Sequence, residues 1–383
     1  MGGGSGGHIT PLLAVASQLK ADSPELIVAA VSERRGVFSH MFEGARPIDD
    51  LYLINAGKYR RYFGQSLFRK LIDFKSLLLN IRDIFRLFLG TLESLVLLLK
   101  IKPGVVFIKG GYVGVPMGIA CRLLRTPYVT HDSDAVPGLT NRLIAGRAVV
   151  NMVGMPPAYY PYPTDKIEFV GVPVTQDFIN PDKISGHRKR RELDIDKDDF
   201  LLLITGGSNG AQRLDKVVHG AMRLLLTKHH NLRIIHQIGK DNQKIYEDYP
   251  IKLHSRIRVS PFLTPLSGYI AAADMVITRA GATAITEIGH LQKPLIVVPN
   301  ASLAGGHQTK NAELLRESSA AVIINEAQAV ENPELLVECI DKLIKSAQQR
   351  ADISGNLYKL TKTNAAEKIS RSLLSISRGG NGK

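Results

Sequence analysis

The feature that most restricts the fold is a repeated unit, in which an apolar strand, a glycine-rich turn and a helix follow one another. In the first half of the chain, residues 104–108 predict a strand, and residues 115–124 predict a helix after Gly110 and Gly111. In the second half, residues 200–205 predict a strand that leads through another glycine turn into a helix. This alternation predicts an α/β fold with parallel sheets that are covered by helices on both faces.

The chain divides at a change in composition. Residues 156–181 are rich in proline, and a charged stretch follows them. The 383 residues suffice for at least two domains at about 150 residues each. We predict a first domain over residues 1–173, a second over 174–355, and a C-terminal helical segment over 356–383 that packs back on the first. Two such halves favour a ligand site in a cleft between them.

The overall composition excludes several protein classes. Hydrophobic residues make up 44% of the chain and charged residues 22%, which argues against a largely disordered protein. Two cysteines cannot form a disulfide framework or a cysteine-rich zinc site. No signal peptide is evident, and the longest apolar stretch is too short to span a bilayer. The net charge of +14 attracts polyanions, whether nucleic acid, anionic membrane or phosphorylated ligands.

The N-terminal sequence MGGGSGGHIT contains a glycine run with only Met1 in front of it. A strand-to-helix turn of this kind needs a strand before it. We therefore expect a first strand of roughly five or six residues to be missing from this sequence. The alternative is that the turn is built in a different way.

The segment from Lys58 to Lys102 is both basic and apolar. It carries ten lysines and arginines against three acidic residues, with leucine and phenylalanine interleaved at helical spacing. A basic amphipathic helix of this kind docks on an anionic phospholipid surface. The alternative is a helix that faces the core and has a solvated cationic rim. No nucleic-acid-binding module is visible, so nucleic acid is not expected as a partner.

Two strand-to-helix turns in the second half suggest a nucleotide site. The first contains Ser208, whose hydroxyl would assist the backbone N–H groups in binding a phosphate, although the turn alone is equally compatible with packing. The second begins at Arg279. Glu287 falls one helical turn after Thr283, where its carboxylate would accept hydrogen bonds from ribose hydroxyls. The alternative for Glu287 is a surface ion pair with a lysine.

Two histidines offer further chemistry. His8 ends the first glycine run and is a candidate general base, with a purely structural role as the alternative. His131 begins the sequence HDSD, which has one histidine and two carboxylates within four residues. We expect these carboxylates to cap the following helix rather than to bind a metal ion.

Six motifs together resemble one family. They are, in chain order, GGGSGGHITPLLAVA, KGGYVGVPMGIA, HDSDAVPGLTNR, LLITGGSNGAQRLD, ITRAGATAITEIGHLQKPLIVVP and GHQTKNAELL. They are similar to the MurG family of glycosyltransferases in peptidoglycan biosynthesis. The resemblance implies a GT-B fold, with two Rossmann-like parallel-sheet domains facing across a cleft. It also implies an inverting hexosyltransferase that needs no metal or other cofactor.

The implied reaction moves GlcNAc from UDP-GlcNAc to the C4 hydroxyl of MurNAc in undecaprenyl-pyrophosphoryl-MurNAc-pentapeptide, converting lipid I to lipid II. The implied location is peripheral, at the cytoplasmic face of the cell membrane. Proteins of cell-wall synthesis and cell division are the implied protein partners.

The resemblance also implies residue roles. His8 matches the catalytic base, Ser208 the serine of the diphosphate turn, Leu263 the backbone position that holds uracil, and Glu287 the ribose ligand. The other implied substrate-binding residues are Ser5, Gly6, Gly7, Tyr112, Asp134, Thr175, Asn209, Arg279, Ala282, Thr283, Ala284, Ile285, Thr286, Gln308 and Asn311.

Some positions depart from the family pattern. Asp134 stands where asparagine is common, and Thr175 stands where an arginine is usual, which removes a cationic contact. Asn209 and His307 each replace a glutamine.

Three other functions are compatible with these motifs. The first is a different GT-B lipid-sugar transferase, and the second is a UDP-GlcNAc 2-epimerase, which would not need the basic apolar segment. The third is a non-catalytic membrane scaffold that binds a UDP-sugar. The presence of His8 and Glu287 argues against the scaffold.

Overall fold

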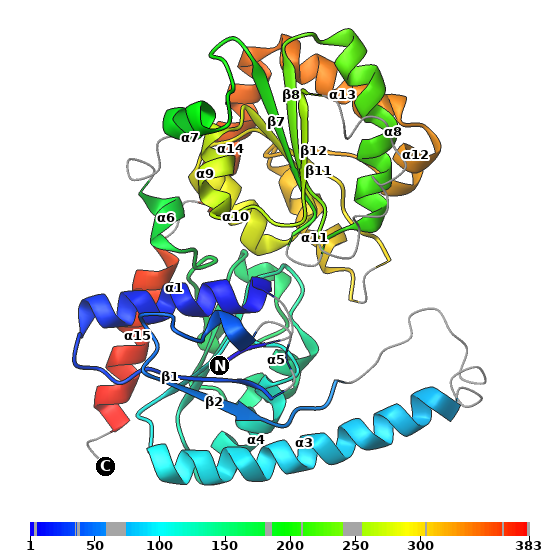
Figure 1. The fold of residues 1–383 in the computed structure, drawn as a ribbon. Helices are drawn as coiled ribbons and strands as arrows, with labels where there is room; N and C mark the ends of the chain where they lie inside the picture. The colour runs from blue at the N-terminus through cyan, green and yellow to red at the C-terminus, as the bar shows by residue number, and fades with distance from the viewer. Residues whose placement is uncertain are drawn as a thin grey trace. The chain divides into compact units, whose positions relative to one another are not determined.

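The computed structural model describes the chain except residues 4–5, 35, 37–38, 59–73, 181–185, 208–209, 240–254, 303–304, 362–363 and 381–383, and except the side chains of residues 74–77 and 380. The chain forms two compact units (Figure 1). The first contains Met1–Thr175 and Thr363–Lys383, and the second contains Gln176–Lys362. The C-terminal segment that packs on the first unit therefore begins at Thr363 rather than at residue 356. Residues 356–361 belong to a helix of the second unit.

The first unit contains two parallel sheets. The two-stranded sheet pairs β1 (Ala29–Glu33) with β2 (Asp50–Ile54). The four-stranded sheet has the order β3 (Val106–Ile108), β4 (Tyr128–Asp132), β5 (Val150–Val153) and β6 (Ile167–Phe169). This sequential order of parallel strands needs a crossover after each strand, and helices provide most of these crossovers.

Helices cover both faces of the first unit. Its α-helices are α1 (Gly6–Asp22), α3 (Phe74–Ile101), α4 (Gly114–Leu124), α5 (Leu139–Ile144) and α15 (Ala365–Gly380). Its short 3₁₀ helices are η1 (Ser39–Met41), η2 (Ala145–Arg147), η3 (Pro157–Tyr159) and η4 (Thr164–Lys166). One core cluster joins Val15 of α1 and Leu373 of α15 to the sheet, and another joins Leu97 of α3 and Met117 of α4 to it. The serine hydroxyl of Ser370 donates to Asp22 at 2.6 Å and ties α15 to α1.

The second unit has one six-stranded parallel sheet. Its strand order is β12 (Val322–Ile323), β11 (Leu295–Val297), β10 (Met275–Thr278), β7 (Phe200–Thr205), β8 (Leu232–Gln237) and β9 (Ile257–Ser260). Its helices are α6 (Gln176–Ile179), α7 (Gly186–Glu192), α8 (Gln212–Lys228), α9 (Leu266–Ala272), α10 (Ala282–His290), α11 (His307–Glu317), α12 (Glu326–Glu331), α13 (Glu334–Lys345) and α14 (Ala347–Thr361). Every residue of β7 is buried, as expected for a central strand with helices on both faces.

The strand order of the second unit reverses direction beside β7. From β7 the chain proceeds to β8 and β9 on one side, and then it returns to β10 on the other side. Open α/β sheets bind ligands outside the carboxyl ends of the strands at such a switch point. The predicted α/β architecture with parallel sheets in two units is confirmed.

Candidate functional site

Two strand-to-helix turns of the second unit lie next to each other at the switch point. Thr205 at the end of β7 is paired with Thr278 at the end of β10, and the Thr278 hydroxyl donates to the Thr205 carbonyl oxygen at 2.8 Å. The turn after β7 leads to α8, and the turn after β10 leads to α10. The N-termini of two helices are thereby held at neighbouring strand ends. Their backbone N–H groups and dipoles favour an anionic ligand there.

The turn after β7 depends on glycine for two reasons. Gly207 and Gly210 have φ angles of +80° and +68°, which disfavour other residues. A Cβ atom on Gly206 would lie 2.7 Å from the Ala211 side chain. A Cβ atom on Gly207 would meet nothing within 4 Å, so the space beside this residue is open. Ser208 and Asn209 lie outside the described residues, and their roles in binding a diphosphate stay predictions.

Gln237, at the end of β8, connects this turn to the segment after β9. Its amide nitrogen donates to the Gly207 carbonyl oxygen, and its amide oxygen accepts from the Leu263 N–H, both at 3.3 Å. Leu263 is buried, which fits a role for its backbone rather than its side chain. Gln237 was not predicted as a site residue from the sequence. A polar residue at the end of an apolar strand is the sequence pattern from which Gln237 could have been predicted.

The first turn of α10 exposes mainly backbone groups rather than polar side chains. Gly281 is the N-cap residue, and a Cβ atom there would meet nothing within 4 Å. The Thr286 hydroxyl donates to the Ala282 carbonyl oxygen at 2.9 Å, and Ile285 is buried. These two side chains therefore offer no polar group at the surface. Thr283 and Ala284 are half-buried in the first turn of the helix.

Glu287 has an unusual electrostatic environment. It is half-buried and lies one turn after Thr283 on α10. Desolvation by burial raises its pKa to about 8. A carboxyl group in this environment gains from hydrogen-bond donors, because they stabilise its ionised form. The alternative for this residue was a surface ion pair with a lysine. None of the described ion pairs joins Glu287 to a lysine.

Arg279 forms a buried ion pair instead of facing outward. It is 7% exposed, and its guanidinium donates to the Val298 carbonyl oxygen at 2.9 Å. It also lies 2.5 Å from one carboxylate oxygen of Glu326, and Arg213 lies 3.4 Å from the other oxygen. Arg279 is therefore positioned to hold the loops after β10 and β11. This geometry does not favour direct contact with a departing diphosphate, and Glu326 was not identified from the sequence.

Gln308 and Asn311 connect α11 to the same edge of the sheet. The Gln308 amide oxygen accepts from the Asn300 N–H at 2.8 Å, and the Asn311 amide donates to the Ala280 carbonyl oxygen at 2.8 Å. Asn311 is 1% exposed. Both residues fix the backbone around α10 and α11, and their predicted contact with a donor sugar stays a prediction.

Two glycine segments of the first unit are in contact. Gly110 and Gly111 follow β3 with φ angles of +107° and +76°. A Cβ atom on Gly111 would lie 2.6 Å from the Gly3 carbonyl oxygen, and one on Gly3 would collide with the Glu33 carboxylate. The hydroxyl of Tyr112 donates to Glu33 at 3.2 Å, and burial, with Glu33 nearby, raises the pKa of Tyr112 to about 12. The N-terminal glycine run and the glycine turn after β3 therefore lie next to each other in the folded unit.

His8 lies in the first turn of α1 and is half-buried, between buried and exposed neighbours. Gly6 and Gly7 begin this helix, and Ser5 lies outside the described residues. Lys109, which directly precedes Gly110, is 4% exposed. Burial lowers its pKa to about 8, while Asp134 and Asp132 act in the opposite direction. This buried cation next to the glycine turn was not predicted from the sequence.

The HDSD segment organises the loops after β4. The Asp132 carboxylate accepts from the backbone N–H of Gly138, the N-cap residue of α5, at 2.9 Å, and from the Tyr162 hydroxyl at 2.7 Å. Asp132 thus fixes the residue that precedes α5, but no side chain bonds the N–H groups of the first helical turn in the described structure, so the predicted side-chain cap is not observed. The carbonyl oxygen of Asp134 accepts from Tyr160 at 2.8 Å. Thr175, the last residue of the first unit's main segment, is half-buried. In the described part of the chain, no three metal-ligating side chains form a cluster.

Helix α3 has apolar residues on two faces. Leu97 and Leu98 are buried against the sheet. A second set is 44–66% exposed and recurs at helical spacing: Leu78, Ile81, Ile84, Phe85, Phe88, Leu92, Val96 and Leu99. The outer face of α3 is therefore apolar as well as cationic. Residues 59–73 of the basic apolar segment lie outside the described residues.

The arginines of α3 are partly neutralised. Arg82 and Arg86 lie 3.0 and 3.5 Å from Asp83, which is 5% exposed. No helix in the described parts of the chain is long and apolar enough to cross a membrane.

Comparison with known proteins identifies the family. Residues 1–150 match the Glycosyltransferase family 28 N-terminal domain, and residues 201–369 match the Glycosyltransferase family 28 C-terminal domain. A protein of Clostridium novyi (strain NT) is 31% identical over 369 residues, which cover 96% of this chain and 95% of that protein. A protein of Bacillus cereus is 30% identical over 380 residues, which cover 98% and 97%. Both are named UDP-N-acetylglucosamine–N-acetylmuramyl-(pentapeptide) pyrophosphoryl-undecaprenol N-acetylglucosamine transferase, the second with the number 2.

Solved structures support the fold. The crystal structure of Acinetobacter baumannii MurG has a TM-score of 0.68 and 24% identity, and the match covers 97% of each chain. A UDP-GlcNAc 2-epimerase from Neisseria meningitidis has a TM-score of 0.66 with 14% identity, over 96% of this chain and 97% of that chain. At such identities these likenesses show the GT-B fold class alone. The sequence relatives carry the assignment further: the chain belongs to the MurG family of glycosyltransferase family 28 and is a hexosyltransferase.

Proposed function

We propose that this hexosyltransferase moves GlcNAc from UDP-GlcNAc to the C4 hydroxyl of MurNAc in undecaprenyl-pyrophosphoryl-MurNAc-pentapeptide, with inversion at the anomeric carbon. Relatives at about 30% identity over nearly the full length are named for this transfer. The observation that carries the proposal is the pair of helix N-termini at the ends of β7 and β10, with Glu287 one turn into α10.

The second unit would bind the donor. The diphosphate lies at the N-terminus of α8, where backbone N–H groups and the helix dipole stabilise the charge that develops as UDP departs. The Ser208 hydroxyl adds a donor there. The ribose hydroxyls donate to Glu287, and the uracil ring binds the backbone at Leu263, which Gln237 holds in place.

The first unit would supply the base. The C4 hydroxyl oxygen of the acceptor attacks the anomeric carbon, the bond from that carbon to the UDP oxygen breaks, and His8 takes the hydroxyl proton. Neutral imidazole is suited to this step near pH 7. Gly6 and Gly7 place backbone N–H groups at the start of α1, where the acceptor pyrophosphate would lie.

Helix α3 would hold the enzyme at the membrane. Its exposed apolar side chains would enter the interface of an anionic phospholipid surface, which gives a peripheral location at the cytoplasmic face of the cell membrane. Asp83 partly neutralises Arg82 and Arg86, so these two arginines would contribute less to the binding than the exposed apolar side chains. Association with proteins of cell-wall synthesis and division stays a prediction.

The proposal is tested by following radiolabelled UDP-GlcNAc with the full chain. One reaction contains a short-chain analogue of the lipid-linked MurNAc-pentapeptide acceptor, and the other contains no acceptor. The expected result is label in the acceptor product and unchanged UDP-GlcNAc in the second reaction. Conversion of UDP-GlcNAc to UDP-ManNAc without acceptor would instead identify an epimerase, and binding without any product would favour the scaffold.

A further inference from the structure

Lys109 is a buried cation to which the proposed reaction assigns no role. It directly follows β3 and precedes the glycine turn at Gly110 and Gly111, at the carboxyl edge of the four-stranded sheet. Only 4% of the residue is exposed. Among the described residues, no hydrogen bond or ion pair includes its side-chain nitrogen. A buried charge is costly unless it is paired, so this amine suits an anionic ligand.

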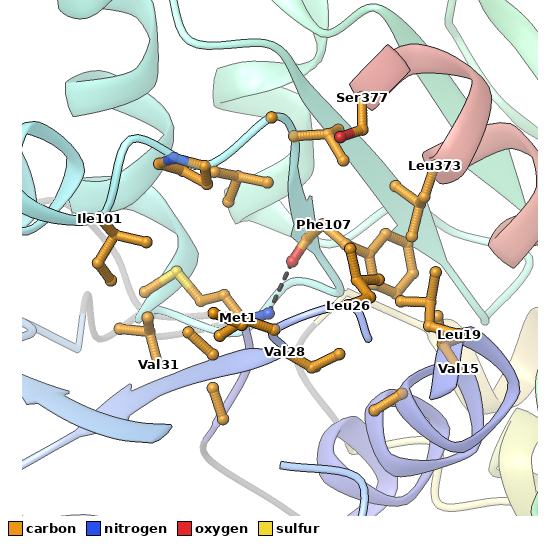
Figure 2. Close-up of a pocket in the computed structure, with 18 of the residues that line it drawn as sticks. Met1, Val15, Leu19, Leu26, Val28, Val31, Ile101, Phe107, Leu373 and Ser377 are labelled. Carbon is orange, nitrogen blue, oxygen red and sulfur yellow. Dashed lines mark hydrogen bonds between the residues drawn. The ribbon is translucent and has the colours of Figure 1, made fainter. Parts of the chain in front are cut away.

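The side chain of Lys109 begins beside the first turn of α1. The Lys109 N–H donates to the Met1 carbonyl oxygen at 3.0 Å, and the Met1 amino group donates to the Phe107 carbonyl oxygen at 2.7 Å (Figure 2). A Cβ atom on Gly2 would lie 3.6 Å from the Lys109 Cβ and 3.4 Å from the His8 carbonyl oxygen. Lys109 is therefore close to the residue that is the proposed base.

Two carboxyl groups also lie near the Lys109 amine. Asp132 ends β4, the strand that pairs with β3, and Asp134 follows two residues later. Burial lowers the pKa of Lys109 to about 8, and Asp134 and Asp132 oppose this shift through their charge. The Asp132 carboxylate already accepts from the Gly138 N–H and the Tyr162 hydroxyl. In the described structure, neither carboxyl group forms an ion pair with Lys109.

The charge balance at this edge of the sheet depends on Lys109. The start of α1 directs backbone N–H groups and a positive dipole end at an anion. Asp132 and Asp134 have the opposite effect, because like charges repel strongly in a poorly solvated site. The Lys109 ammonium group offsets this repulsion. It is also a compact charge with three donors, which suits a phosphate oxygen.

The inference rests on the proposed function, which brings a diphosphate-linked acceptor to the first unit. We propose that the Lys109 ammonium group binds a phosphate oxygen of the acceptor diphosphate, between the first turn of α1 and the glycine turn after β3. Lys109 is then a substrate-binding residue, and its charge also offsets that of Asp134.

The test measures acceptor binding without transfer. The full chain is saturated with UDP, which occupies the second unit and carries no sugar to transfer. The short-chain analogue of the diphosphate-linked acceptor is then titrated by calorimetry. Lys109→Met keeps an unbranched apolar side chain and removes the charge. The control is Lys20→Met, which removes a lysine that lies 2.7 Å from Asp49, near the other end of α1.

Lys109→Met is expected to lower the affinity for the acceptor analogue at least about tenfold, the lower range for a hydrogen bond between charged groups. Affinity for UDP should stay within about twofold, and Lys20→Met should bind both ligands normally. Equal acceptor affinity in Lys109→Met and the unmodified chain would overturn the inference and leave the proposed function intact. If the unmodified chain does not bind the acceptor analogue, the proposed function fails as well.

A second pair of variants separates phosphate binding from simple neutralisation of Asp134. Asp134→Asn is compared with the double variant Asp134→Asn and Lys109→Met. Both lack the Asp134 carboxylate, so only the amine differs between them. The double variant should again bind the acceptor analogue at least about tenfold more weakly.

Equal affinity in this pair would show that Lys109 only neutralises Asp134, and it would overturn the inference. Thermal unfolding is recorded for every variant. If Lys109→Met alone does not fold, the comparison within the Asp134→Asn pair decides, because that background has no Asp134 charge left to offset.

Discussion

Arg279 and Glu326 form an ion pair that is 2.5 Å long and almost fully buried, and it connects the loop after β10 to the start of α12. Both residues lie close to the switch point, where a diphosphate would bind. Arg279 therefore holds the loop after β10 in place through Glu326 rather than binding the diphosphate itself.

Substituting Glu326→Gln is expected to destabilise the second unit. The change leaves the Arg279 charge buried without its carboxylate, and losing one member of a buried pair costs about 3–5 kcal/mol. Urea unfolding of the full chain measures the effect. The control is Glu313→Gln, which removes a surface pair with Lys310 and is expected to cost less than about 1 kcal/mol. Equal stability of the two variants would contradict the buried-pair argument.

Glu287 predicts a pH dependence of donor binding. Because its pKa is raised to about 8, most of the carboxyl groups are protonated below that pH in the free enzyme. The ionised form is the better acceptor for two ribose hydroxyls, so affinity for UDP-GlcNAc should rise between about pH 6 and pH 9. Titration calorimetry over this range measures it. Glu287→Gln should bind more weakly and remove the slope, and an unchanged slope would exclude Glu287 as its source.

Glu287 also predicts a pH dependence of stability. Its pKa is raised from the ordinary value of 4.5 to about 8 in the folded protein, so between these values the folded chain binds more protons than the unfolded chain. The contribution of Glu287 to stability therefore decreases as the pH rises from about 4.5 to 8.

Urea unfolding between about pH 5 and 8 measures this contribution in the unmodified chain and in Glu287→Gln. The variant should lack the decrease in unfolding free energy that Glu287 causes. An identical pH slope in the two chains would contradict the assignment to Glu287.

The exposed apolar side chains of α3 predict membrane binding. Phe85→Glu combined with Phe88→Glu places charge where apolar groups would enter the interface, and should reduce binding to anionic vesicles at least about tenfold. Co-sedimentation with vesicles measures this. Leu123→Glu, on α4 and 63% exposed, is the matched control. Equal loss in both variants would show that α3 is not the docking helix.

Much of the architecture followed from local sequence signals. β7 occupies the predicted residues 200–205, because the continuous apolar run FLLLIT before a glycine turn is typical of a strand that is buried on both faces. Helix α1 begins at Gly6 and continues through Pro11, since contacts with the rest of the unit outweigh the absent Pro11 N–H. Short strands such as β6 and β12 carry too few residues for a recognisable pattern.

The site was less predictable because several of its contacts join distant segments. Gln237 and Leu263, Arg279 and Glu326, and Glu33 and Tyr112 are brought together only by the folded sheet. The glycine turns and Glu287, in contrast, lie within single strand–turn–helix units, and their local pattern identified them.

The central claim is tested most directly by separating donor binding from transfer in His8→Ala. UDP-GlcNAc binding should stay within about twofold of the unmodified chain, whereas GlcNAc transfer to the short-chain acceptor should fall by at least about 100-fold, the lower range for a general base. His187→Ala, an exposed histidine of α7, is the control and should transfer at the normal rate. Full transfer activity in His8→Ala would contradict the account.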